Sequence, residues 1–251
     1  MRFPTLLTFD FDAEFVMQNL YPKDRYWLSQ GEYGGNVGIY RILSLLEREK
    51  IKATFCVVGK AAEKYPKAVL KLTSLGHEVA VHGYTHKAYQ ELSFEEEYLE
   101  ITKTSKILRK LTGEKPYGHR TPGWRPSENT IKILSHKGFL WSSDYLGCDT
   151  PFFHEMEGRK TKILEIPVAY TLDDWDLFFG GNTPSQVFEV WKEEFDCLFE
   201  EKKLFCLTCH PLVSGRPSRL KALKLFISHV KKHKEAEFMR IIDFVREFEK
   251  S

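Results

Sequence analysis

The sequence predicts an α/β fold in which parallel strands alternate with helices. Short apolar runs of strand length alternate along the chain with segments whose apolar residues recur at helical spacing. The chain has 251 residues, and (β/α) barrels commonly have about this length. No low-complexity linker divides it, so we expect a single domain over residues 1–251.

Local signals in the first half predict three strands and two helices. Apolar runs predict strands at 6–11, 53–58 and 78–81. A helix over 61–75 is expected to end at Gly76, because glycine commonly follows the last helical turn. A second helix is expected over 37–50, where five apolar residues face inward, namely Ile39, Ile42, Leu43, Leu45 and Leu46.

The second half continues the alternation. Ser93 and the acidic residues 95–97 predict the cap and first turn of a long helix that ends near Gly113. Residues 116–124 are expected to be extended, and Gly138 to end a helix over 127–136. The basic tract 231–234 is expected to be a solvated helix end. Further elements are expected as strands at 139–143, 163–170 and 204–209 and as helices over 185–201 and 219–232.

Composition and charge exclude several classes of function. Lysine plus arginine (37) nearly balances aspartate plus glutamate (35), giving a formal net charge of +2 and no long-range field that favours nucleic acid or an acidic membrane. No apolar run approaches the roughly 20 residues needed to span a bilayer, and no signal segment is evident. We therefore expect a cytoplasmic protein. Its oligomeric state is open, a homo-oligomer included.

The five cysteines are expected to be buried thiols in a reducing compartment, because they lie in apolar stretches: Cys56, Cys148, Cys197, Cys206 and Cys209. Cys206-Leu-Thr-Cys209-His210 also has the spacing of c-type haem attachment and of redox pairs. Haem attachment requires export, and a redox pair normally opens a helix. We therefore interpret this pair as buried strand residues.

His82 and His86 are the strongest indication of chemistry, because two imidazoles at this spacing can face one metal ion. Asp10, Asp12 and Glu14 share a strand face and offer a third ligand. Two histidines and a carboxylate, with positions left for water and substrate, are the usual ligands of hydrolytic zinc. We expect one divalent ion, zinc first, with cobalt, nickel or manganese as alternatives. The alternative is a polar turn and ordinary loop histidines.

Functional residues of such folds gather where strands end. The acids, His82, Arg120 and His210 all fall at predicted strand ends. Four segments there resemble motifs of the polysaccharide deacetylase family, also called carbohydrate esterase family four. They follow the family order: Thr8-Phe-Asp10-Phe-Asp12, His82-x-x-x-His86, Arg120-Thr-Pro122-Gly-Trp124 and Leu207-Thr-Cys-His210. The resemblance spans nearly the whole chain and implies a distorted (β/α) barrel of about seven parallel strands.

The resemblance also implies residue roles. Asp10 would be the catalytic base, held by Arg120, and His210 the general acid. Asp12, His82 and His86 would bind the metal. The aspartate that tunes the acid histidine is either Asp144 or Asp174, which precedes Trp175, and we favour Asp174. The less favoured alternatives are that His210 is a satisfied core histidine and that Arg120 belongs to a surface ion pair.

Aromatic residues near these motifs are the expected substrate contacts. Trp124, Trp175 and Phe178, with Pro122, could bury a ring while leaving its polar edges free to hydrogen-bond. The same aromatic residues, and Phe179, could instead pack in the core or at an interface. Glu14 is assigned no role.

Two features depart from the common family pattern. Phe11 separates two aspartates that are normally adjacent. The segments 172–175 and 210–217 resemble a branch without signal segments, which includes deacetylase-type allantoinases and an intracellular peptidoglycan-deacetylase-like enzyme. Several of those allantoinases lack the metal ligands, whereas all three are present here.

Three functions follow as hypotheses. The first is a metal-dependent hydrolase of amide carbon–nitrogen bonds that removes N-acetyl groups from an amino sugar or glycan. The second is an allantoinase-like hydrolase of a cyclic amide, imide or ureide. The third is a catalytically silent carbohydrate-binding protein on the same fold, although the retention of every catalytic residue type argues against it. We expect a small soluble substrate, an N-acetyl sugar or a cyclic amide, because there is no export signal and little net charge.

Overall fold

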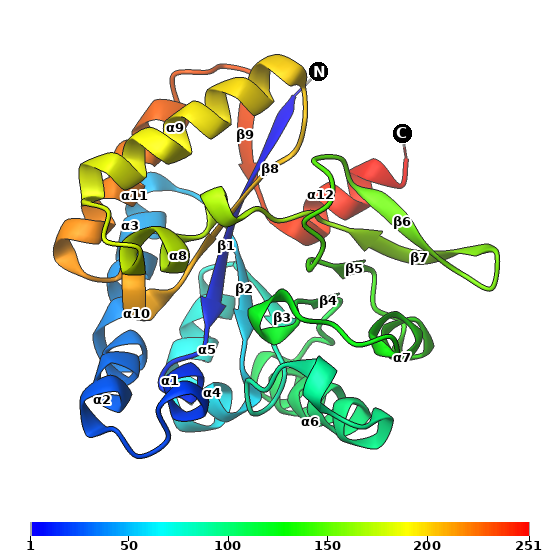
Figure 1. The fold of residues 1–251 in the computed structure, drawn as a ribbon. Helices are drawn as coiled ribbons and strands as arrows, with labels where there is room; N and C mark the ends of the chain where they lie inside the picture. The colour runs from blue at the N-terminus through cyan, green and yellow to red at the C-terminus, as the bar shows by residue number, and fades with distance from the viewer. Residues whose placement is uncertain (1, 251) are drawn as a thin grey trace.

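A curved sheet of nine strands forms the centre of this computed structural model, which describes residues 2–250. The strands are β1 (Phe3–Phe11), β2 (Thr54–Val57), β3 (Glu78–Val81), β4 (Gly118–His119), β5 (Trp141–Ser142), β6 (Phe152–Met156), β7 (Arg159–Glu165), β8 (Phe205–Cys209) and β9 (Ala236–Met239). Their order is β6-β7-β5-β4-β3-β2-β1-β8, with β9 also paired to β1. Among the strand pairs of the described residues, only β6–β7 is antiparallel. The sheet curls into a half-barrel, which confirms the predicted α/β class (Figure 1).

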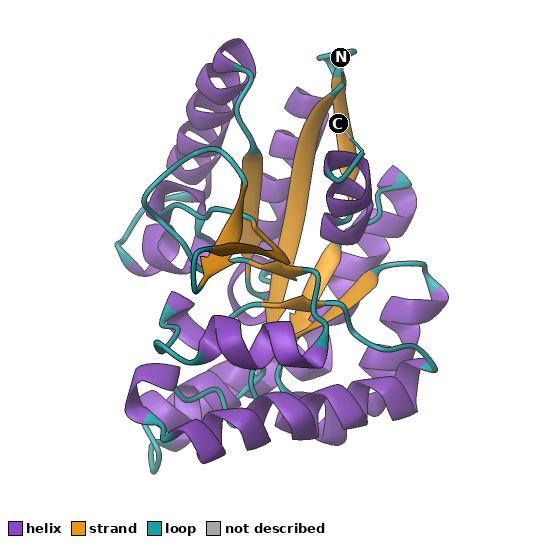
Figure 2. Cartoon of the chain, turned by 90° about the vertical axis from the view of Figure 1, so that its right-hand side faces the viewer, coloured by secondary structure: helices purple, strands orange, loops and turns teal. Residues whose placement is uncertain are grey.

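Helices surround the sheet (Figure 2). The α-helices are α1 (Phe15–Leu20), α2 (Arg25–Tyr33), α3 (Ile39–Glu49), α4 (Gly59–Lys64), α5 (Pro66–Ser74), α6 (Phe94–Thr112), α7 (Thr130–Lys137), α8 (Asp174–Phe179), α9 (Pro184–Glu201), α10 (Pro211–Ser214), α11 (Pro217–Val230) and α12 (Ile241–Phe248). A π-helical turn, η1 (Gly34–Gly38), joins α2 to α3. Three 3₁₀ turns complete the set: η2 (Tyr89–Glu91), η3 (Pro122–Trp124) and η4 (Tyr170–Leu172).

A capping box begins the long helix α6, and a proline divides a helix that the sequence predicted to be continuous. Ser93 and Glu96 form a reciprocal capping box at the start of α6, as the sequence predicted. The helix expected over 61–75 is instead two helices, α4 and α5, which meet at Tyr65. Pro66 follows Tyr65, and a residue before proline is disfavoured in the helical region. Tyr65 accordingly leaves it, with φ −120° and ψ 52°.

Other boundaries also differ from the prediction. The strand expected at 163–170 ends at Glu165, and 116–124 contains only a two-residue strand followed by η3. The prediction omitted the helices α1, α2, α8, α10 and α12 and the strands β6 and β9. The helix α1 is only six residues long, which is too short to show a helical period. The hairpin strand β6 is half-exposed and lacks a continuous apolar run.

Three cysteines are buried as expected, and two are not. Cys56, Cys206 and Cys209 are buried, and burial raises their pKa values, which disfavours the reactive thiolate. Cys148 is half-buried and Cys197 is exposed, contrary to the prediction. Cys197 lies on the solvent side of α9, because the apolar face of this helix is occupied by other residues.

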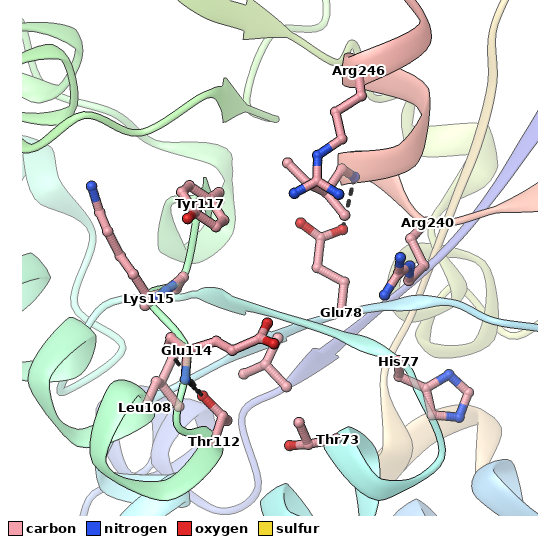
Figure 3. A pocket seen from close by; sticks show the side chains of 13 residues that line it. Thr73, His77, Glu78, Leu108, Thr112, Glu114, Lys115, Tyr117, Arg240 and Arg246 are labelled. Carbon is pink, nitrogen blue, oxygen red and sulfur yellow. Dashed lines mark hydrogen bonds between the residues drawn. The ribbon is translucent and has the colours of Figure 1, made fainter.

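The two edges of the sheet differ in character. At the amino edge, a hollow of about 280 Å³ lies between β3 and α12 and is lined by His77, Glu78, Arg240 and Arg246 among others (Figure 3). At the carboxyl edge, the chain leaves β1, β3, β4 and β8 at successive positions along the curve. Within residues 2–250, none of the helices has the length and apolar character needed to cross a bilayer.

Candidate active site

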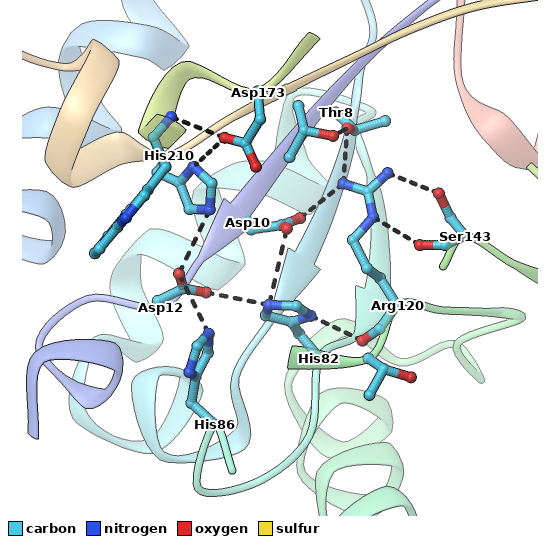
Figure 4. Close-up of polar contacts among 12 residues, drawn as sticks. Thr8, Asp10, Asp12, His82, His86, Arg120, Ser143, Asp173 and His210 are labelled. Carbon is cyan, nitrogen blue, oxygen red and sulfur yellow. Dashed lines mark hydrogen bonds and ion pairs between the residues drawn. The ribbon is translucent and has the colours of Figure 1, made fainter. Parts of the chain in front are cut away.

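Asp12 lies among three imidazoles at the carboxyl edge of the sheet (Figure 4). It follows β1, whereas His82 follows β3 and His210 follows β8. Its carboxylate oxygens lie 3.4 Å from His82 Nε2, 3.5 Å from His86 Nε2 and 3.8 Å from His210 Nε2. Burial acts to raise the pKa of Asp12, but His86, His82 and His210 outweigh it and hold that pKa below its usual range.

Asp12, His82 and His86 fit a divalent ion. Both oxygens of Asp12 are buried and have no hydrogen-bond partner among the described residues, a costly arrangement unless a cation satisfies them. Bonds of 2.0–2.1 Å to a tetrahedral zinc ion would place ligand atoms roughly 3.3 Å apart, close to the separations observed. His82 Nδ1 also donates to the carbonyl of Arg120 at 2.8 Å, which leaves its Nε2 lone pair free for the ion.

The loop between the two histidines is held from both sides. The carboxylate of Glu100, on α6, accepts hydrogen bonds from the backbone of Tyr84 (2.6 Å) and Thr85 (2.7 Å) and from the Thr85 hydroxyl (2.8 Å). Asn19, on α1, donates to the carbonyls of Thr85 (3.0 Å) and His86 (2.7 Å). His86 has φ 62°, an unusual value for a residue with a side chain, so these contacts hold a strained backbone.

Arg120 holds Asp10 in place. Its Nη1 donates to Asp10 Oδ1 (2.9 Å) and to the Thr8 hydroxyl (2.8 Å), while Nη2 donates to the Ser143 hydroxyl (2.9 Å). Arg120 is fully buried, which excludes the surface ion pair considered from sequence. Burial acts to lower the pKa of Arg120, but Asp10 raises it above its ordinary value, so the guanidinium stays charged beside the carboxylate.

His210 is oriented by Asp174. Its Nδ1 donates to Asp174 Oδ1 at 2.6 Å, and its backbone N–H also donates to this carboxylate, as does that of Ser214. Asp173 lies 3.6 Å from the same Nδ1. Burial acts to lower the pKa of His210, but Asp173 and Asp174 raise it well above 6.5, which favours a protonated imidazole.

Asp144, the alternative partner of His210, lies elsewhere. It accepts hydrogen bonds from the Thr121 backbone (2.7 Å) and hydroxyl (2.9 Å), so it anchors the loop that follows Arg120. Burial, with Glu165 nearby, raises its pKa to about 7. The structure therefore pairs Asp174, and not Asp144, with His210.

The expected aromatic contacts divide into two groups. Trp175 is half-buried with its ring 5.5 Å from that of His210, and Trp124 packs 5.7 Å from Tyr170 near the Arg120 loop. Pro122 is buried and lies beside Gly83, and Gly83 belongs to the loop that leads to His86. Phe178 does not reach the site. It packs in the core against Trp191, because α8 turns this face towards α9.

Other residues near the site were not assigned from sequence. Glu14 contacts Lys64 and accepts a hydrogen bond from the Tyr65 hydroxyl (2.9 Å), so it fastens the segment after Asp12 to α4. Asn19, Glu100, Ser143 and Ser214 contribute contacts described above. Asp173 could have been noticed, since it lies in the Leu172–Trp175 segment that the sequence singled out. The others show no local pattern that marks them.

Known proteins resemble this chain in sequence and in fold. A sequence profile for polysaccharide deacetylase matches residues 30–140. The chain is 27% identical to a peptidoglycan deacetylase from Helicobacter pylori over 254 residues, which covers 88% of this chain and 87% of the relative.

Two solved structures match in both fold and sequence. A Mycobacterium smegmatis protein assigned as a polysaccharide deacetylase has TM-score 0.91 and 29% identity, covering 98% of this chain and 90% of that one. Puue allantoinase has TM-score 0.88 and 26% identity, covering 97% and 89%. The homologues indicate a hydrolase of carbon–nitrogen bonds other than peptide bonds. The chain is therefore similar to polysaccharide deacetylases in sequence over residues 30–140 and in fold over nearly its whole length.

Proposed function

We propose that this protein is a metal-dependent N-deacetylase that removes the acetyl group from an N-acetylated amino sugar or glycan. One observation carries the proposal: the unsatisfied buried carboxylate of Asp12 faces His82 and His86, and both Asp10 and His210 lie beside this group. Asp12, His82 and His86 would hold one divalent ion, zinc as the first choice. When bound, the ion would polarise the amide carbonyl and favour ionisation of water.

Asp10 would act as the general base. Its Oδ1 is committed to Arg120, whereas its Oδ2 lies 3.8 Å from His82 Nε2 and is directed towards the proposed ligand group. Arg120 occupies Oδ1, so Oδ2 is the oxygen that would accept a proton from the attacking water. Thr8 and Ser143 fix the guanidinium, so the direction of Asp10 is set before substrate binds.

His210 would act as the general acid. Asp174 accepts the Nδ1 proton, which directs the Nε2 proton of the imidazolium towards the ligand group, 3.8 Å from Asp12. Transfer of that proton to the amide nitrogen would allow the carbon–nitrogen bond to break, giving an amine and acetate. Trp175 packs on one side of the imidazole, and with Trp124 and Pro122 it is our candidate for contact with the sugar.

A second candidate is hydrolysis of a cyclic ureide or related cyclic amide. The likeness to Puue allantoinase over nearly the whole chain favours it. The same acid and base would serve, but the carbon–nitrogen bond would lie within a ring, so a single product would form and no acetate would be released. The two reactions therefore differ in a directly measurable product.

Product analysis on zinc-loaded protein tests the proposal. Acetate release is measured with short N-acetylglucosamine oligomers and with a long N-acetylated glycan, and ring opening with allantoin. Acetate release that disappears in Asp10→Asn and persists in Asp176→Asn, an exposed aspartate of α8, is the expected result. Faster turnover on the long glycan would contradict our preference for a small substrate. Ring opening without acetate would favour the second candidate, and no turnover of either class would contradict both.

A further inference from the structure

A second group of metal-ligating side chains lies between two outer helices, α9 and α11. It comprises Asp196 on α9, His229 in the last turn of α11, and His233 just beyond that helix, with candidate ligand atoms all within 4.8 Å of one another. The chain continues from His233 into β9, which pairs with the first residues of β1, whereas Asp12 follows the last residue of β1. The group is therefore at the opposite edge of the sheet from the candidate active site (Figure 1).

The three side chains converge on a common point. Asp196 Oδ1 lies 2.6 Å from His229 Nε2 and 3.8 Å from His233 Nε2, and the two imidazole centroids are 5.0 Å apart. Tetrahedral zinc would require ligand atoms roughly 3.3 Å apart. To reach this separation, the Asp196–His229 contact must lengthen and the Asp196–His233 contact must shorten, each by less than 1 Å. Movements of this size are available to side chains that are 13% exposed in His229, 26% in His233 and 37% in Asp196.

Contacts behind the imidazoles prepare them for ligation. His233 Nδ1 lies 3.3 Å from the carbonyl of His229 and can donate to it, which leaves the Nε2 lone pair facing Asp196. His82 uses the same arrangement with the carbonyl of Arg120. Phe195 packs against both imidazoles, at 5.8 and 5.1 Å, so the rings are supported on their buried side and accessible on the other.

From this geometry we infer that Asp196, His229 and His233 form a second divalent-metal site, which takes zinc or a neighbouring borderline transition ion such as nickel or copper. Two imidazoles and one carboxylate suit these ions better than magnesium or calcium, which prefer oxygen. Because the ligands come from two helices, the ion would join α9 to the end of α11.

The basic tract 231–234 is then more than a solvated helix end. Of its lysines, Lys231 is neutralised by Glu49 at 2.7 Å, and Lys232 and Lys234 are exposed.

Counting zinc equivalents tests the inference without reference to catalysis. Zinc bound by the full-length metal-free protein is measured by competition with a chromogenic chelator, for wild type, His233→Gln and His229→Ala. Each variant should bind one equivalent fewer than wild type. His136→Ala, which removes an exposed histidine from the last turn of α7, should bind as many as wild type. If the candidate active site binds no metal, the wild-type count becomes one and the difference between the proteins persists.

Zinc-dependent stability provides the second readout. Added zinc should raise the melting temperature of a His82→Ala/His86→Ala protein, in which only the second site remains, and adding His233→Gln should abolish the rise. His233 is partly exposed, so this change should leave the circular dichroism spectrum intact. Equal zinc counts in wild type and both variants would overturn the inference, and would leave Asp196 and His229 as a simple hydrogen-bonded pair. A melting-temperature rise that survives His233→Gln would overturn it as well.

Discussion

Glu100 is expected to control the affinity of the candidate active site for metal, although it touches none of the ligand side chains. Its carboxylate accepts three hydrogen bonds from Tyr84 and Thr85, the residues immediately before His86. Without this anchor, the strained backbone at His86, with φ 62°, could relax and withdraw the imidazole from Asp12. Metal binding would then have to restore the loop at a cost in free energy.

The size of the effect follows from the three contacts. A hydrogen bond to a charged group contributes about 1.5–3 kcal/mol, and half-burial of Glu100 reduces this, so Glu100→Ala should cost about 2–4 kcal/mol in all. Every 1.4 kcal/mol that appears in binding is a factor of about ten in the dissociation constant. We expect about 1.4–2.8 kcal/mol of this cost to appear in binding, so zinc should bind about 10–100-fold more weakly, the usual effect of losing a group that orients a ligand.

Glu100→Gln is the graded comparison. Its oxygen can still accept the two backbone N–H groups and its amide can donate to the Thr85 hydroxyl, so the loss should stay below about tenfold. Zinc dissociation constants are measured by chelator competition, with circular dichroism as the test of folding. Glu95→Ala, an exposed change in the first turn of α6, is the matched control. A folded Glu100→Ala protein that binds zinc within about threefold of wild type would refute the reasoning.

Three further predictions concern the catalytic groups and the ion. Asp10→Asn and His210→Ala should each lower turnover by roughly 100-fold or more with metal content unchanged, because each removes an acid or base and no proposed ligand; loss of metal from a folded Asp10→Asn protein would make Asp10 a ligand instead. Asp174→Asn should lower turnover roughly tenfold or more without weakening zinc binding, because it removes the charge that orients and protonates His210; unchanged kinetics would exclude that role. Chelation of zinc present at about 100 times its dissociation constant should remove about 2.7 kcal/mol of stability, or roughly 5–10 °C in melting temperature, as checked by calorimetry; an unchanged melting temperature in wild type would contradict metal binding.

Residues close to the strands could be predicted because the sheet is parallel. Asp10 and Asp12 end one apolar run and His82 ends another, and the carboxyl ends of neighbouring parallel strands meet at one edge. The spacing of His82 and His86 then implied a shared ion. This reasoning requires only that the strands be identified correctly. The bounds of β1, β3 and β8 were each predicted to within a few residues.

Residues that act through tertiary packing could not be predicted. Asn19 and Glu100 meet the His86 loop from α1 and α6, and no local pattern joins these segments. Phe178 and Phe179 are adjacent, and consecutive residues of a helix point about 100° apart. Only the packing of α8 against α9 decides that Phe178 enters the core and Phe179 stays exposed.

The π-helical turn η1 also depends on a distant contact. A side chain at Gly38 would place its first carbon 2.0 Å from the carbonyl of Pro211, the residue that follows His210. Glycine therefore lets η1 lie directly against α10, which begins at Pro211 and supports the position of His210. From the sequence, no element was expected over residues 34–36, and residues 37 and 38 were placed in the helix expected over 37–50.

His77, which lines the hollow at the amino edge of the sheet, is expected to make the fold sensitive to acid (Figure 3). Burial, with the cations Lys52 and Arg240, lowers its pKa from 6.5 to about 4, and its Nδ1 accepts a hydrogen bond from the Ala53 backbone at 3.1 Å. Between pH 6.5 and about 4, His77 is mostly protonated in the unfolded chain and mostly neutral in the folded chain. Stability from this residue is therefore complete above pH 6.5 and is lost as the pH falls towards 4.

The loss between pH 7 and pH 5 should be about 2 kcal/mol by linkage, and His77→Asn should remove it. The asparagine oxygen can accept the Ala53 N–H in place of Nδ1, so the variant keeps the hydrogen bond but cannot titrate. Urea unfolding at the two pH values should show a smaller acid loss in His77→Asn than in wild type by this amount. His136→Asn, at an exposed histidine, should behave as wild type. Equal acid losses in His77→Asn and wild type would mean that the folded chain protonates His77 as readily as the unfolded chain does.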